Sequence, residues 1–110
     1  MEVRGFFEYK LEEGKQEAYR ELIPRLRDKR TQAGLMNYSV CESVDQKNLV
    51  VETFLAPSIE EYRDVEAKLL KDPETVELLN TLDTYIVGGA AAKKVWFFAE
   101  LNFSQGKGTL

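Results

Sequence analysis

Two charged side chains inside strand-like segments are the residues of this sequence best placed to do chemistry. Arg4 lies in the segment 2–9 and Glu52 in the segment 49–55, both rich in aromatic and β-branched residues. A buried unpaired charge is costly, so each needs a partner if its strand is covered. An Arg4–Glu52 pair across neighbouring strands is either a structural ion pair or a site in which Arg4 orients an anionic or phenolate substrate and Glu52 accepts a proton. Burial alone would favour the protonated form of Glu52, whereas pairing with Arg4 would favour its carboxylate form. The sequence leaves both possibilities open.

The absence of histidine removes most other catalytic and cofactor chemistry. Histidine is the commonest general base and metal ligand, and the chain of 110 residues has none. Without a neighbouring histidine, the single cysteine, Cys41, is expected to be buried and inert. The carboxylates of 12–13 and 60–61 are adjacent in sequence and diverge on a helix, and the glycines 88–89 precede a strand rather than a phosphate-binding helix. We expect neither a metal nor another cofactor.

Composition restricts the partners and the compartment. The formal net charge is −4, whereas nucleic-acid-binding domains carry concentrated positive charge. The densest basic stretch, residues 25–30, ends a predicted helix, where cations complement the helix dipole. No apolar run approaches the ~18 residues of a membrane span, and the first residues show no apolar signal-peptide core. With a single cysteine, these features predict a cytoplasmic protein that has neither a nucleic-acid nor a membrane partner.

The predicted elements follow the order β-α-β-β-α-α-β. Strand patterns cover 2–9, 36–44, 49–55 and 94–101, and helical patterns cover 12–32, the segment from Ile59 to the break at 71–73, and a segment that begins at Pro73. Pro24 should kink or divide the first helix near Ile23. This order is the split βαβ pattern of a ferredoxin-like α+β fold with a four-stranded antiparallel sheet. We expect one domain over residues 1–103 and a C-terminal tail over 104–110.

Side-chain alternation in the predicted hairpin suggests that the protein pairs with itself. With the turn at 45–48, Glu42 lies opposite Val51 and Cys41 opposite Glu52. One hairpin face then carries mainly apolar residues: Met36, Tyr38, Val40, Val44, Leu49, Val51, Thr53 and Leu55. The helices can cover only one face of the sheet, so the apolar face needs a cover from outside the chain. A symmetric homodimer is the commonest solution.

Three short segments carry a resemblance to a known family. They are 9–15, Tyr-Lys-Leu-Glu-Glu-Gly-Lys; 34–38, Gly-Leu-Met-Asn-Tyr; and 48–54, Asn-Leu-Val-Val-Glu-Thr-Phe. With the amphipathic helix after the first segment, the chain resembles the antibiotic-biosynthesis-monooxygenase-like branch of the dimeric α/β-barrel superfamily over residues 2–101. The resemblance implies two sheets that close into a barrel-like dimer, and a pocket where each sheet meets its helices. Haem-degrading members of the superfamily need a histidine that this chain lacks.

The resemblance also implies candidate site residues and functions. The pocket would lie on the sheet face that holds Arg4, Phe6, Glu8, Ser39, Cys41, Glu52 and Phe54. Arg4 and Glu52 are the catalytic candidates, and Phe6, Phe54, Tyr62 and Trp96 are the ligand-binding candidates. Tyr62 and Trp96 are equally compatible with core or interface packing. The implied function is non-catalytic binding of a small aromatic molecule, for instance in a stress response. The alternatives are a cofactor-independent monooxygenase that acts on a small aromatic or phenolic substrate, and a solidly packed dimer without a cavity.

Overall fold

A computed structural model of the protein describes residues 1–101. Its elements are β1 (Val3–Lys10), α1 (Gln16–Ala33), β2 (Met36–Glu42), β3 (Leu49–Ala56), α2 (Ile59–Leu69), α3 (Pro73–Tyr85), the short 3-10 helix η1 (Ala90–Ala92) and β4 (Lys94–Phe98). This order confirms the predicted β-α-β-β-α-α-β arrangement. The predicted domain boundary at residue 103 and the tail 104–110 lie outside the described residues.

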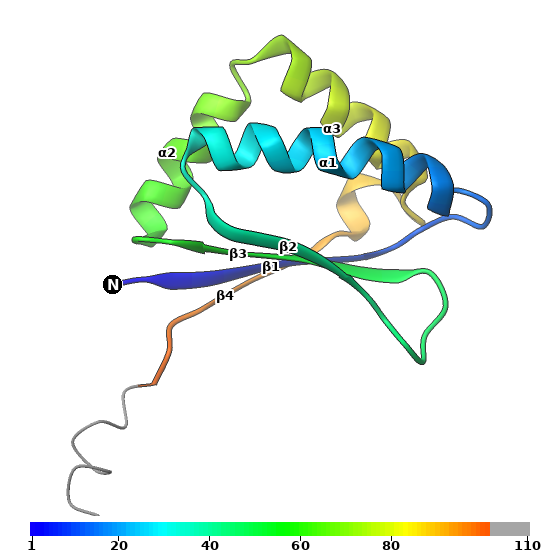
Figure 1. Ribbon diagram of the computed structural model, residues 1–110, viewed down its shortest axis with the longest axis horizontal. Helices are drawn as coiled ribbons and strands as arrows, with labels where there is room; N and C mark the ends of the chain where they lie inside the picture. The colour runs from blue at the N-terminus through cyan, green and yellow to red at the C-terminus, as the bar shows by residue number, and fades with distance from the viewer. Residues whose placement is uncertain (102–110) are drawn as a thin grey trace, which may run out of the picture.

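The four strands form one antiparallel sheet in the order β2-β3-β1-β4. Helices α1, α2 and α3 all lie on one side of this sheet (Figure 1). The layered arrangement confirms the ferredoxin-like α+β fold. The core lies between the two layers, and it leaves the opposite face of the sheet without a helix from the described part of the chain.

Local sequence signals explain where the helices begin and end. Ser58 begins α2, and its side chain accepts a hydrogen bond from the Glu61 amide at 3.0 Å. Gly34 ends α1 with a φ of 122°, a conformation that side chains disfavour. Of the two predicted effects of Pro24, a kink or a division, the structure excludes the division, because α1 continues through Pro24 as one helix. Buried side chains pack the helix against the core on both sides of the proline, and this packing compensates for the missing amide donor.

The hairpin register differs from the prediction by one residue. Cys41 pairs with Val51 instead of Glu52, because the connection between the strands includes Asn48 in a left-handed conformation with a φ of 66°. A bulge near Asn37, whose φ is 51°, shifts the pairing again between Met36 and Ser39. A one-residue shift moves every side chain to the other face of the sheet. Both predicted hairpin faces were therefore wrong in part.

The open face, on the far side of the sheet from the helices, combines apolar and polar side chains. By register it carries Arg4, Phe6, Glu8, Met36, Ser39, Cys41, Val51, Thr53, Leu55, Lys94, Trp96 and Phe98. The ring centroids of Phe6 and Phe98 lie 5.5 Å apart, and Trp96 is 47% exposed. Cys41 is exposed on this face, so the expectation that this cysteine is buried was wrong for the single chain.

Candidate functional site

Glu52 lies at the centre of a buried polar network. Its side chain points from β3 toward the helices and is 0% exposed. Oε1 accepts hydrogen bonds from Nη1 of Arg30, at 2.5 Å, and from the Tyr38 hydroxyl. Oε2 accepts a hydrogen bond from the Tyr9 hydroxyl at 2.7 Å. Three donors therefore surround the carboxylate, and one of them is cationic, which is what a buried negative charge requires.

Arg30 is the member of this network that the sequence analysis missed. It ends a stripe of buried α1 side chains, after Tyr19, Leu22 and Leu26, at helical spacings of three and four. The basic stretch 25–30 drew attention to the helix end, and the spacing of Arg30 behind Leu26 was the signal that it faces inward. The Arg30 side chain is 6% exposed as a result.

The predicted pair between Arg4 and Glu52 was wrong. Arg4 projects from β1 on the open face, and its Nη2 lies 3.8 Å from Oε1 of Glu100 on the surface. The helix-facing positions of β1 are the odd-numbered ones, including Phe7 and Tyr9. Glu52 points to the helices, so the sheet itself separates the two predicted catalytic side chains.

The four aromatic ligand-binding candidates divide between the two faces. Phe54 and Tyr62 meet in the core, with nearly parallel rings whose centroids are 5.5 Å apart. Phe97 lies against Tyr62, with the centroids 4.8 Å apart. Phe6 and Trp96 pair with each other in the β1–β4 register and lie on the open face, away from this cluster. The structure thus brings together two of the four candidates.

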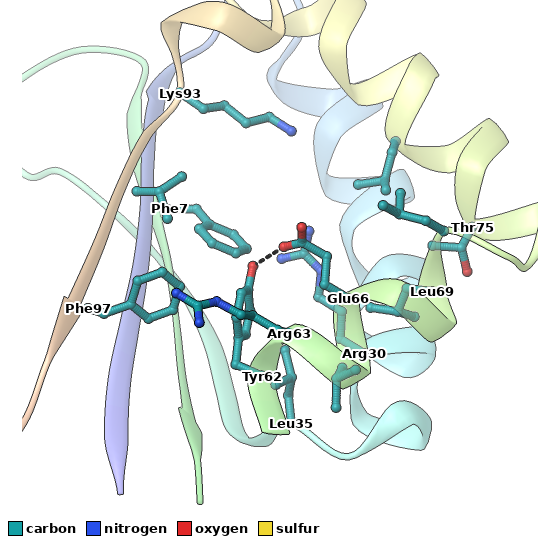
Figure 2. Close-up of a pocket in the computed structure, with 14 residues that line it drawn as sticks. Phe7, Arg30, Leu35, Tyr62, Arg63, Glu66, Leu69, Thr75, Lys93 and Phe97 are labelled. Atoms are coloured by element: carbon teal, nitrogen blue, oxygen red, sulfur yellow. Dashed lines mark hydrogen bonds between the residues drawn. The ribbon is translucent and has the colours of Figure 1, made fainter. Parts of the chain in front are cut away.

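A cavity of about 490 Å³ lies between the sheet and the helices, beside this aromatic cluster (Figure 2). Aliphatic and aromatic side chains form most of its walls, among them Leu35, Val65, Leu69, Leu79, Phe7 and Phe97. Arg30, Tyr62, Arg63, Glu66, Thr75 and Lys93 supply its polar groups. The Tyr62 hydroxyl donates a hydrogen bond to Glu66 at the cavity wall (Figure 2). A concave, mainly apolar pocket with a few polar groups is typical of small-molecule sites.

The tyrosines around Glu52 are held in their protonated form. The Tyr9 and Tyr19 hydroxyls lie 2.8 Å apart, so the network extends from Glu52 toward α1. Burial, aided by the negative charge of Glu52, raises the pKa of Tyr9, Tyr19 and Tyr38 above the ordinary value of 10.0. These hydroxyls therefore act as hydrogen-bond donors at neutral pH rather than as bases.

The raised tyrosine pKa values predict a loss of stability at alkaline pH. The unfolded chain releases these protons near pH 10 while the folded chain retains them, so stability is full below pH 10 and falls as the pH rises above it. We expect a loss of about 1 kcal/mol per buried tyrosine between pH 10 and pH 11. Urea unfolding at several pH values measures this loss. The Tyr9→Phe variant should lose less over this interval than the wild type, and equal losses would contradict the prediction.

Residues 1–101 contain neither a metal-ligand cluster nor a membrane-spanning helix. No group of three or more His, Cys, Asp or Glu side chains there lies close enough together to hold a metal ion. No helix in the same range is long and apolar enough to cross a membrane.

Comparisons with known proteins show the class of fold. The cofactor-independent oxygenase SnoaB from Streptomyces nogalater is 13% identical, with a TM-score of 0.72, and the match covers 92% of this chain and 94% of SnoaB. A NIPSNAP family protein from Agrobacterium tumefaciens is 15% identical, with a TM-score of 0.76 and coverage of 94% and 96%. A proposed antibiotic biosynthesis monooxygenase from Nitrosomonas europaea is 13% identical, with a TM-score of 0.74 and coverage of 91% and 90%.

The chain therefore shares its α+β fold with solved antibiotic-biosynthesis-monooxygenase-like proteins and with a NIPSNAP family protein. No protein-family model matches its sequence, and no curated protein matches it in a sequence search. At identities this low the likeness concerns the fold, and function has to be argued from the site.

Proposed function

We propose that the protein binds a small, mainly apolar or aromatic molecule in the cavity between its sheet and helices. The observation that carries this proposal is the cavity itself, about 490 Å³ in volume and walled largely by apolar side chains. A molecule of drug size fills a site of this volume, and burial of its apolar surface stabilises the complex by ~25 cal/mol per Å². The role is non-catalytic binding, for instance in a stress response. We place the protein in the cytoplasm, a reducing setting that suits a chain with a single cysteine and therefore no intrachain disulfide.

Filling the cavity should abolish ligand binding. We expect 2-naphthol to bind the wild-type protein once per protomer with a Kd of about 0.1–1 mM, as judged from the area that it can bury. In Val65→Trp, the indole occupies the space of the ligand, and the affinity should fall at least tenfold. Isothermal titration calorimetry measures both values.

The matched control for this experiment is Val44→Trp. Val44 lies in the β2–β3 connection and is fully exposed, so the same substitution leaves the cavity unchanged. This variant should bind 2-naphthol like the wild type. The absence of binding to the wild type, or equal binding by Val65→Trp in a folded state verified by circular dichroism, would contradict the proposal.

A second candidate function is cofactor-independent monooxygenation of a phenolic substrate in the same cavity. The likeness to SnoaB and the contact of Arg30 with the cavity support it, because a guanidinium can stabilise a phenolate. In such a reaction one oxygen atom of O₂ enters the substrate, and two hydrogens of the substrate convert the other into water. Oxygen uptake with anthrone, compared between the wild type and Val65→Trp, distinguishes this activity from binding alone.

We also propose that the open face joins two copies of the chain into a homodimer. Trp96, Phe98 and Met36 are large apolar residues that are exposed on this face, and their burial favours association. Sedimentation velocity at micromolar concentration should give twice the chain mass of 12.6 kDa. Trp96→Glu places a charge among the exposed apolar side chains of the face and should shift the protein toward the monomer, whereas Val44→Glu should not. A wild-type protein that sediments as a monomer would refute the dimer.

A further inference from the structure

The charged groups at the cavity are mostly cationic, although the chain as a whole is acidic. Arg30, Arg63 and Lys93 contribute three positive charges to the lining and Glu66 one negative charge, while the formal charge of the chain is −4. Glu52 and Asp83, which pair with Arg30 and Lys93, do not line the cavity. A bound molecule therefore meets the N–H donors of these three cations, whose partner carboxylates lie outside the lining, and Glu66 is the one carboxylate at the wall. The Lys93 side chain reaches over the cavity from the segment before β4 (Figure 2).

Arg30 is held so that part of its guanidinium remains available to a ligand. The guanidinium carbon lies 4.9 Å from the Phe7 ring centroid and 5.8 Å from that of Tyr38, so aromatic rings pack near the group. Within residues 1–101, its only hydrogen bond runs from Nη1 to Glu52. None of its nitrogens is both fully buried and without a partner, so the N–H groups that do not bond Glu52 retain some accessible surface, and Arg30 is one of the residues that line the cavity.

A buried guanidinium with unused donors has a specific chemical preference. Its planar N–H groups match the two oxygens of a carboxylate, and hydrogen bonds between ionised groups are about twice as strong as those between neutral groups. Glu52 fixes the orientation of Arg30 in advance, so little side-chain freedom is lost when a ligand binds. The apolar walls, including Val65, Leu79 and Phe97, accommodate the rest of the molecule.

We infer that the ligand is an organic carboxylate with an apolar body, whose carboxylate binds the free N–H groups of Arg30. This inference rests on the proposed binding function and names the class of its ligand. In this arrangement Arg30 is the specificity-determining residue, and Glu52 is a positioning residue that holds the guanidinium toward the cavity.

Two probes of the same shape test the inference. Isothermal titration calorimetry with 2-naphthoate and with the uncharged 2-naphthamide, at pH 7 and low salt, compares a carboxylate with a neutral group that retains a carbonyl oxygen. We expect naphthoate to bind about ten- to a hundredfold more tightly, which corresponds to one charge-assisted hydrogen-bonded contact. An amide that binds equally well overturns the carboxylate inference but supports the binding function. Failure of both probes and of 2-naphthol overturns the binding function itself.

A variant and a spectroscopic measurement assign the preference to Arg30. Arg30→Lys keeps a cation beside Glu52 and removes the planar donors, so the preference for naphthoate should fall below threefold while the amide affinity is unchanged. Arg20→Lys on the exposed side of α1 is the matched control and should retain the full preference. If Arg30→Lys does not fold, NMR of the wild-type arginine Nε–H groups provides the answer. One resonance should shift with naphthoate and not with naphthamide, and unchanged spectra overturn the inference.

Discussion

Replacement of Arg30 by methionine should lower the free energy of unfolding by about 3–5 kcal/mol, because it leaves a buried carboxylate without its cation. Glu52 is 0% exposed, and Arg30 is its only ion-pair partner within residues 1–101. The hydroxyls of Tyr9 and Tyr38 would remain as donors, but neither can neutralise the charge. Urea unfolding at a fixed protein concentration, followed by circular dichroism, measures the loss.

Arg20 provides a matched control on the same helix. Its Nη2 lies 3.1 Å from Oε1 of Glu42, but both side chains are largely exposed. Exposed pairs contribute about 0.2–1 kcal/mol, so Arg20→Met should cost far less than Arg30→Met. Addition of Glu52→Gln to Arg30→Met removes the unpaired charge and should restore part of the stability. Equal losses for Arg20→Met and Arg30→Met would show that the buried pair does not have the predicted role.

Gly5→Ala should destabilise the protein by about 1–3 kcal/mol or more, although alanine ordinarily suits a strand better than glycine. A methyl group on Gly5 would lie 2.2 Å from Cζ of Phe54, closer than any real contact. The Phe54 ring cannot move aside easily, because it is stacked on Tyr62 and lies against Phe7, with ring centroids 5.5 and 5.1 Å apart. Thermal unfolding by differential scanning calorimetry measures the effect.

A second substitution tests whether the Phe54 ring is the cause. The smaller side chain of Phe54→Leu leaves room for the new methyl group, so Gly5→Ala should cost less in that background than in the wild type. Arg4→Ala, at the preceding position of β1 but on the open face, should change stability by less than about 0.5 kcal/mol. A neutral or stabilising Gly5→Ala would mean that the ring does not lie over the glycine as described.

The sequence alone was sufficient to predict the architecture of this protein. Runs of β-branched and aromatic residues, a helical period in 12–32, and the signals at Gly34 and Ser58 depend on neighbours a few residues away. The structure confirms the order of elements and the ferredoxin-like fold for that reason. The same local reasoning also identified Glu52 as a charge that would need a partner.

Only the tertiary structure decided which side chains meet at the site. The predicted partner of Glu52 was Arg4, whereas the actual partner is Arg30, 22 residues away on α1. Strand faces alternate with every residue, so an error of one position in β1 or in the hairpin register moves a side chain through the sheet. The left-handed residues Asn37 and Asn48 set that register, and alternation alone did not reveal them.

The cavity depends on the tertiary structure to an even greater degree. The sequence indicated Phe54 and Tyr62 as candidates, but Phe54 is packed behind Tyr62, while Phe7, Phe97 and side chains of α3 form the wall. The sequence determined which residues are apolar and which elements they occupy. The packing of the helices on the sheet determined the space left between them, because that space depends on contacts between segments far apart in the chain.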